Sequence, residues 1–215
     1  NKALYDSEYG YYTKRNPFGS KGDFVTSPNI SILFSEAIAV WCVSFWEKLE
    51  KPNPINIVEL GPGNGTLAKG LIQSFNNFNK FKDKYRIYLH EKSRRLKKIQ
   101  KKTIASKNVK WINNFNEIKK GPVIIIANEF FDSLPIKQYV YKNKNWYEKY
   151  VELKNYNTLN FLYKRVSLPN FKKICKLDIS KNQKFIEFSI EMINYIKKIS
   201  KLINIHNGGL ICFDY

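Results

Sequence analysis

Apolar runs and helical spacings alternate along the first two thirds of the chain. Short runs that favour buried strands lie at 55–60, 85–90, 109–111, 121–127 and, near the end, 208–215. Between them, apolar residues recur every three or four positions over 66–75, as expected for a helix. The β-branched run at 123–127 is typical of a central strand buried on both faces. Strands alternating with helices predict an α/β fold with a mostly parallel sheet and helices on both faces.

Three other regions extend this pattern. Residues 29–49 predict a helix, and its apolar positions at helical spacing are Ile30, Leu33, Phe34, Ala37, Ile38, Trp41 and Phe45. Residues 139–163 alternate apolar and polar positions around a polar turn at 142–145, which predicts an inserted antiparallel hairpin. Residues 184–203 predict an amphipathic helix.

The most informative local pattern is a glycine-rich turn after the strand at 55–60. Gly61, Gly63 and Gly65 alternate with other residues, so the backbone can approach a ligand closely. A phosphate-binding loop would need Gly-Lys-Ser/Thr after the turn, which is absent, and Pro62 together with the G-x-G-x-G spacing disfavours the dinucleotide fingerprint. Glu59, two residues before Gly61, makes the segment similar to the first motif of S-adenosylmethionine-dependent methyltransferases. A tight strand-to-helix turn without a ligand is the alternative.

A second carboxylate follows the strand at 85–90. Glu91 there can accept hydrogen bonds from both ribose hydroxyls of a nucleoside. By itself it could equally be a solvated residue at a helix start, but its place one strand after the glycine turn favours ribose binding. Polar residues also follow the strand at 121–127, among them Asn128, Glu129 and Asp132, and helix capping by Asp132 or Ser133 is their alternative role.

Composition narrows the possible classes of function. The 215 residues are 43% hydrophobic, which indicates a globular chain, and no apolar run approaches the length of about 20 that spans a bilayer. Three scattered cysteines and two histidines complete no zinc spacing, so no metal is expected, and we predict a reducing compartment with Cys42, Cys175 and Cys212 as small core residues.

The net charge of +19 raises the possibility of a nucleic-acid partner. The charge is mostly lysine in a chain rich in Asn and Ile, which also fits a compositional bias. The densest basic segment, 92–102, is interpreted as a helix that turns Leu96, Ile99 and Ile104 inward and its cations to water, in preference to a phosphate-binding stripe.

Four segments in one order carry a resemblance to a known family. They are Tyr9–Tyr12, Gly22–Pro28 (GDFVTSP), Glu59–Leu67 and Asn128–Pro135 (NEFFDSLP). Together they closely resemble the MidA family of methyltransferases, whose mitochondrial member is a complex I assembly factor that methylates an arginine. The chain departs from the expected family pattern after Ser27, where Pro-Glu is expected and this sequence has Pro28-Asn29. The resemblance covers essentially the whole chain, although the usual fold has seven strands, so the C-terminal strands are expected to be missing here.

The resemblance implies a Rossmann-like class I methyltransferase with four parts. These are a loop and helix (1–50), the donor-binding core (51–138), an inserted hairpin or substrate region (139–183), and a helix with a returning strand (184–215). It implies S-adenosyl-L-methionine as cofactor and a protein arginine as acceptor, with a subunit of respiratory complex I as the candidate substrate. The compartment would be bacterial cytoplasm, or the mitochondrial matrix in a eukaryote.

Site roles are assigned on this basis. The cofactor-binding residues would be Glu59, Gly61, Pro62, Gly63, Gly65, Thr66, Glu91, Gly22, Asp23 and Asn128. The catalytic residues would be Glu129, Asp132, Asn128 and Asp23, because a planar guanidinium pairs best with carboxylates. By position, Asn113, Asn114 or Phe115 would approach the adenine.

Two other functions stay open. The basic balance and Asn128 suit a nucleic-acid methyltransferase, in which an Asn accepts from an exocyclic amine, although Glu129 and Phe130 stand where such enzymes have prolines. A methyltransferase-like fold could also serve as a non-catalytic assembly module.

Overall fold

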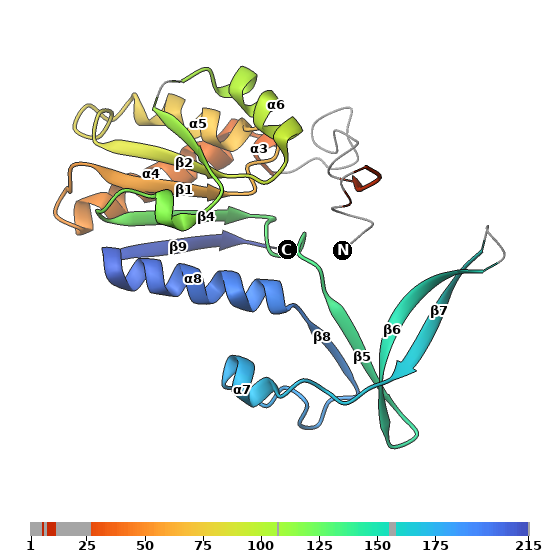
Figure 1. Cartoon of the computed structure of the whole chain (residues 1–215). Helices are drawn as coiled ribbons and strands as arrows, with labels where there is room; N and C mark the ends of the chain where they lie inside the picture. The colour runs from red at the N-terminus through yellow and green to blue at the C-terminus, as the bar shows by residue number, and fades with distance from the viewer. Residues whose placement is uncertain (1–5, 7, 12–26, 107, 155–157, 215) are drawn as a thin grey trace. The chain divides into compact units, whose positions relative to one another are not determined.

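The computed structural model describes residues 6, 8–11, 27–106, 108–154 and 158–214 (Figure 1). The predicted site residues Gly22 and Asp23 lie outside the described residues. The chain divides into two compact units, which are described separately. Unit 1 comprises Asn1–Ser133 and Lys197–Tyr215, and unit 2 comprises Leu134–Ile196.

Unit 1 contains a five-stranded sheet in which every strand pair is parallel. Its strands are β1 (Ile55–Leu60), β2 (Tyr85–His90), β3 (Val109–Ile112), β4 (Val123–Asn128) and β9 (Gly208–Phe213). The order is β3-β2-β1-β4-β9, so the chain moves outward from β1 through β2 to β3 and then restarts on the other side of β1 with β4. The five strands predicted from the apolar runs are confirmed. The change of direction between β1 and β4 is the place where open α/β sheets bind ligands, at the carboxyl ends of the strands.

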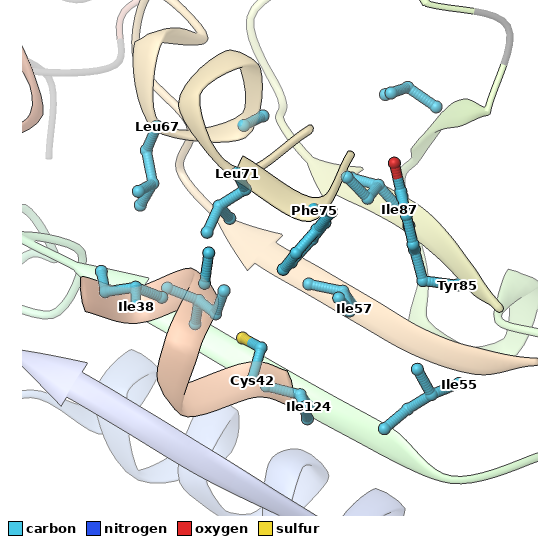
Figure 2. Close-up of a cluster of buried hydrophobic side chains, with 14 of the residues drawn as sticks. Ile38, Cys42, Ile55, Ile57, Leu67, Leu71, Phe75, Tyr85, Ile87 and Ile124 are labelled. Carbon is cyan, nitrogen blue, oxygen red and sulfur yellow. The ribbon is translucent and has the colours of Figure 1, made fainter. Parts of the chain in front are cut away.

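One face of this sheet packs against helices α4 (Ile32–Lys48) and α5 (Thr66–Phe75), while α6 (Arg94–Ile104) packs against α5 and contributes Ile104. The cluster between sheet and helices contains alternate residues of the strands, because side chains along a strand point to opposite faces in turn. Figure 2 shows Ile55 and Ile57 of β1 facing Cys42, Leu71 and Phe75 of the two helices. Helix α8 (Ile190–His206) leads directly into β9, and its part from Lys197 onward belongs to unit 1, where it lies on the opposite side of the sheet (Figure 1).

The first predicted helix needs two corrections. It is divided at Ser31 into a short α3 (Ser27–Ile30) and α4, because the Ser31 side chain accepts the Leu33 N–H and starts a new helix. Its buried face is also displaced from the prediction. Ile30 and Leu33 are exposed, Ala37 faces solvent, and the residues that are buried in α4 are Ser35, Ile38, Ala39, Cys42 and Trp46.

Unit 2 is built on an antiparallel four-stranded sheet of order β7-β6-β5-β8. Its strands are β5 (Lys137–Lys142), β6 (Asn145–Lys154), β7 (Thr158–Arg165) and β8 (Phe185–Phe188), with the short helix α7 (Phe171–Cys175) between β7 and β8. The predicted hairpin is confirmed by the turn at Asn143-Lys144, where both residues have positive φ. A small core gathers Tyr139, Phe171, Ile186 and Phe188.

The helix predicted over 184–203 is wrong in its first part. Phe185 to Phe188 alternate exposed and buried positions and pair with β5, and α8 begins only after Ser189, whose hydroxyl accepts the Met192 N–H. The three cysteines are free, and the prediction that all are core residues holds only for Cys42, since Cys175 is half-buried and Cys212 is exposed. Among the described helices, none has the length and apolar character that crossing a bilayer requires.

Candidate functional site

The glycine turn joins β1 to α5 in a conformation that other residues rarely adopt. Gly61, Gly63 and Gly65 have φ of +61°, +53° and +87°. The Gly61 N–H donates to the His90 carbonyl at 3.0 Å, which ties the turn to the end of β2, and the Gly65 N–H donates to the Pro62 carbonyl at 2.7 Å. These bonds hold a preformed loop at the carboxyl edge of the sheet.

The first and last glycines also lie against neighbouring side chains. A Cβ added to Gly61 would come within 2.9 Å of Phe130 Cδ2, and one added to Gly65 would come within 3.2 Å of Ile104 Cδ1. Thr66, the predicted neighbour of the turn, starts α5, and its N–H and hydroxyl donate to Asn64 Oδ1 at 3.2 and 2.7 Å. A side chain at Gly61 would therefore be strained and would also displace the Phe130 ring.

Two buried carboxyl groups lie next to this turn. Glu59 pairs in register with Leu89 and Ile126, so Glu91 and Asn128, each two residues further on, point to the same face of the sheet as Glu59. Glu59 is 4% exposed and its Oε2 has no hydrogen-bond partner among the described residues. Burial, and secondly the charge of Glu91, raise the pKa of Glu59 to about 8.

Glu91 is also buried but accepts hydrogen bonds from its neighbours. Its Oε1 accepts the Ser93 N–H at 2.8 Å and its Oε2 accepts the Gln100 side-chain amide at 3.1 Å. Burial raises the pKa of Glu91, and these hydrogen bonds oppose the rise. The two carboxyl groups therefore have different roles in the free protein: Glu91 is the better stabilised anion, and Glu59 holds a proton near neutral pH.

The sequence analysis missed Gln100. It predicted that Leu96, Ile99 and Ile104 of the basic helix face the core. The buried residues of α6 are Leu96, Gln100 and Ile104, whereas Ile99 is only half-buried. The sequence signal that could have indicated its burial is the helical spacing, since Gln100 lies four residues after Leu96 and four before Ile104.

The end of β4 contributes a second group of polar residues. Asn128 is half-buried and its Oδ1 is buried without a hydrogen-bond partner among the described residues. Glu129 follows with a φ of +48°, and its N–H donates to the Phe213 carbonyl of β9 at 2.8 Å. A glutamate held in the left-handed region at a strand end is an unusual conformation, and such strain is concentrated at functional sites.

Asp132 adds a second acidic residue to this group, and the structure brings in a third that the sequence analysis did not single out. Asp214, directly after β9, accepts the Phe131 N–H at 3.2 Å. Partial burial, the charges of Asp214 and Glu129 and a hydrogen bond with Asp214 raise the pKa of Asp132. No helix begins among residues 129–136, so the alternative role of Asp132 or Ser133 as a helix cap is wrong. The Ser133 hydroxyl instead donates to the Phe130 carbonyl at 2.7 Å.

The three residues proposed for adenine differ in their availability. Asn113 Oδ1 accepts from Lys97 Nζ at 2.7 Å, and Asn114 caps the short helix η1 (Phe115–Glu117). Phe115 is 9% exposed and its ring lies edge-on to His90, at a centroid distance of 5.3 Å. Burial, and then the charge of Lys92, lower the pKa of His90 to about 4, so this imidazole is neutral at physiological pH.

These residues come together at one edge of the sheet. Glu59 lies near the end of β1 and the glycine turn follows that strand, Glu91 follows β2, Asn128 ends β4 and Glu129 follows it. An open depression of about 390 Å³ lies elsewhere, at the amino ends of β1 and β2, and is lined by Asn53, Pro54, Asp83, Tyr85, Arg86 and Asn108. In the described part of the chain, no group of three or more His, Cys, Asp or Glu residues is arranged to hold a metal.

Comparisons with known proteins agree with this arrangement. Residues 37–215 match the family described as "Putative S-adenosyl-L-methionine-dependent methyltransferase". The mitochondrial protein arginine methyltransferase NDUFAF7 of Xenopus laevis is 31% identical, over 96% of this chain and 53% of the relative. That of Danio rerio is 26% identical, over 100% of this chain and 56% of the relative. The chain thus spans about half the length of these curated relatives.

A solved structure supports the fold independently. A crystal structure of a Burkholderia thailandensis protein bound to S-adenosyl-homocysteine matches with a TM-score of 0.70 at 21% identity, over 92% of this chain and 52% of that one. The family match covers more than half of the chain and includes the glycine turn and all the acidic residues described above. The chain therefore belongs to this family of S-adenosyl-L-methionine-dependent methyltransferases.

Proposed function

We propose that this chain binds S-adenosyl-L-methionine at the carboxyl edge of its parallel sheet and transfers the methyl group to an arginine side chain of a protein. The observation that carries the proposal is the Glu59 carboxyl, which is 4% exposed and has an oxygen without a partner among the described residues. A buried carboxylate without a hydrogen-bond partner is costly unless a ligand supplies a hydrogen bond or a positive charge. S-adenosyl-L-methionine carries an ammonium and a sulfonium, and either charge would stabilise an ionised Glu59.

The other residues of this edge fit the remaining parts of the donor. Glu91 keeps a lone pair on each oxygen beyond those used by Ser93 and Gln100, which suits the two ribose hydroxyls. The backbone of Gly61 and Gly63 offers close approach. Asn128 Oδ1, at the end of β4, is buried with no hydrogen-bond partner among the described residues and suits an N–H or O–H of the methyl donor. Phe115, whose ring lies against neutral His90, is proposed to contact the adenine.

The acidic residues after β4 suit a cationic acceptor. A guanidinium presents parallel N–H donors that match carboxylates, so Glu129 and Asp132 would hold the arginine and fix the nitrogen that reacts. The raised pKa of Asp132 reflects in part repulsion by the charges of Asp214 and Glu129. A bound guanidinium would neutralise this repulsion. Asp23, predicted to support them, remains a prediction, as does Gly22 on the donor side. The inserted region 139–183 is proposed to contribute to acceptor recognition.

The donor supplies an electrophilic methyl group on a sulfonium, and transfer is an in-line displacement that needs alignment above all. Glu129 would orient the guanidinium and take up the proton that its nitrogen loses after transfer. Asn128, at the end of the same strand, would keep the donor in register with that nitrogen. These roles need no metal.

The matched relatives carry names that place them in mitochondria. We therefore propose a protein of the mitochondrial matrix as acceptor, or a cytoplasmic protein if the source is bacterial. The family resemblance puts a subunit of respiratory complex I first among those to be tested.

Two measurements test the proposal. Calorimetry with S-adenosylmethionine and S-adenosylhomocysteine measures donor binding, and label from methyl-tritiated donor in lysate, followed by peptide mapping, identifies the acceptor. We expect binding of both ligands and label on arginine in a protease-sensitive fraction. Label in a nuclease-sensitive fraction would instead show a nucleic-acid methyltransferase, and absence of any donor binding would leave a non-catalytic module.

A further inference from the structure

A fully buried glutamine connects the glycine turn to the carboxylate proposed for the ribose. Gln100 of α6 is 0% exposed. Its Nε2 donates to the Gly63 carbonyl at 2.8 Å and to Glu91 Oε2 at 3.1 Å. Its Oε1 accepts the indole N–H of Trp111 on β3 at 2.8 Å. One side chain thus joins residues that are 9, 11 and 37 positions away in the sequence.

The orientation of this amide is fixed by its neighbours. An indole N–H can only donate and a backbone carbonyl can only accept, so the amide oxygen must face Trp111 and the amide nitrogen must face Gly63. The second N–H of the amide then donates to Glu91. Every polar atom of Gln100 is used, and rotating the amide by half a turn would break all three hydrogen bonds at once.

This arrangement gives the two buried carboxyl groups different hydrogen-bond environments. Glu91 receives the Gln100 and Ser93 N–H groups, whereas Glu59 Oε2 receives none from the described residues. A buried carboxylate that accepts N–H bonds is stabilised in its charged form. Gln100 thereby favours ionisation of Glu91 over that of Glu59, and only an ionised carboxylate accepts from two hydroxyl groups without itself needing an acceptor.

We propose that Gln100 is a positioning residue for ribose recognition: with its amide fixed by Trp111, it holds the Glu91 carboxylate and the Gly63 carbonyl in one geometry that recognises the ribose diol of the donor. This inference rests on the proposed donor site. It predicts a specific dependence, because the contribution of Gln100 to binding must pass through the ribose hydroxyls and not through the donor as a whole.

The test is a cycle of two ligands and two proteins measured by calorimetry. The ligands are S-adenosylhomocysteine and its analogue without the 2′ and 3′ hydroxyls, and the proteins are wild type and Gln100→Met, which keeps the side-chain length but has no N–H donors. We expect Gln100→Met to weaken S-adenosylhomocysteine about tenfold and the dideoxy analogue no more than about twofold, because the hydroxyls lose their oriented acceptor. Trp111→Phe, which keeps a ring and loses only the indole N–H, should reduce the preference for the hydroxyls about threefold.

Gln73→Met is the matched control, since Gln73 is an exposed residue of the neighbouring helix α5, and it should leave both affinities unchanged. Equal weakening of both ligands in Gln100→Met would show a merely structural role and overturn the inference, as would no weakening of either. If wild type binds neither ligand, the proposed function falls and this inference falls with it. If wild type binds both and Gln100→Met keeps the full preference for the hydroxyls, only the inference falls. Trp111→Phe decides the same question should Gln100→Met fail to fold.

Discussion

Two groups of acidic side chains lie at the carboxyl edge of the parallel sheet, and they differ in how their charge is controlled. The proposed donor group, Glu59 and Glu91, is buried, and N–H groups fixed by the fold favour ionisation of Glu91. The proposed acceptor group, Glu129, Asp132 and Asp214, lies beyond the ends of β4 and β9, where Asp132 reaches solvent. There the pKa of Asp132 is raised first by partial burial and then by the charges of its neighbours Asp214 and Glu129.

The difference indicates two kinds of recognition. A rigid site with preassigned protons suits one fixed ligand, because little has to reorganise when the ligand binds. A cluster of partly solvated carboxyl groups suits a cation on a flexible chain, because the repulsion within the cluster is relieved by whichever guanidinium arrives. Changes in the donor group should therefore alter donor affinity, and changes in the acceptor group should alter transfer.

The largest expected effect is on transfer. Glu129→Gln keeps the shape of the side chain but removes the charge proposed to orient the guanidinium and the base proposed to take its proton. We expect methyl transfer to fall at least about a hundredfold while the donor dissociation constant changes less than about twofold. Labelled transfer in lysate and calorimetry measure the two quantities.

The matched control for this variant is Glu36→Gln, an exposed residue of α4. It should retain full transfer. If Glu129→Gln transfers at the wild-type rate, the acceptor role of this residue is wrong. If it loses donor binding as well, the two groups are not separate sites and the comparison above does not hold.

The second effect is on donor binding. Gly61→Ala places a side chain at a φ of +61° and within 2.9 Å of the Phe130 ring, so the turn must shift. We expect a loss of about 1–2 kcal/mol of stability from the strained backbone and at least tenfold weaker donor binding. Gly121→Ala tests strain alone, because Gly121 also has positive φ (+131°) but lies at the opposite edge, near Pro54 and Asn56. If the two variants bind the methyl donor with equal affinity, the glycine turn does not contribute to donor binding.

The third effect is on the number of protons released when the methyl donor binds. With its pKa raised to about 8, Glu59 is mostly protonated at pH 7 in the free protein, and a cationic donor should displace that proton. Calorimetry in phosphate and in Tris, whose ionisation enthalpies differ, counts the protons released. We expect wild type to release most of a proton more than Glu59→Gln does. Equal release from the two proteins would mean that Glu59 does not ionise on binding.

The same shift has a consequence for stability. Between the ordinary pKa of 4.5 and the folded value of about 8, the folded protein binds more protons than the unfolded chain, so stability falls as pH rises and the loss is complete above pH 8. Glu59→Gln lacks this titration. Wild type should therefore lose a few kcal/mol more than the variant between pH 6 and pH 9. Denaturant unfolding at the two pH values measures the difference, and parallel losses would contradict the burial of an ionising Glu59.

Much of the donor group could be predicted because its signals are local. The strand before Gly61, the alternate glycines and Glu91 at the next strand end are all short-range patterns, and parallel strands bring their carboxyl ends to one edge whatever the details of packing. Gln100 could not be predicted in the same way. It is a polar residue in a strongly basic segment, and its burial depends on Trp111 and on Gly63, 37 residues away.

The acceptor group and the elements near it depend even more on distant contacts. Asp214 is placed by the N–H of Phe131, 83 residues earlier, so no local pattern singled it out. Strand β8 is only four residues long and is defined by its pairing with β5, which its apolar residues alone do not distinguish from the start of a helix. The buried face of α4 was misjudged because apolar residues occur on several of its sides, and packing against α5 selects among them.

The smallest predicted effect tests whether the acceptor carboxyl groups act together. Asp214→Asn removes one charge that raises the pKa of Asp132, while the asparagine oxygen can still accept the Phe131 N–H. Since Asp132 must be ionised to hold a guanidinium, transfer should be lost on the acidic side of its pKa. In the variant that loss should occur at lower pH. At neutral pH, acceptor binding should weaken only about threefold, as expected for one partly solvated carboxylate among three.

The pH profile of labelled transfer in lysate measures this shift, with Asp83→Asn, an exposed residue at the opposite edge of the sheet, as the control. An unchanged acidic limb in Asp214→Asn would mean that the charge at position 214 does not influence the pKa of Asp132 during transfer. A shift to lower pH without a change in donor affinity would show that the repulsion within the acceptor group is what the guanidinium relieves. The two groups would then be distinguished by function as they are by burial, since no change at Asp214 should reach the fixed N–H donors around Glu91.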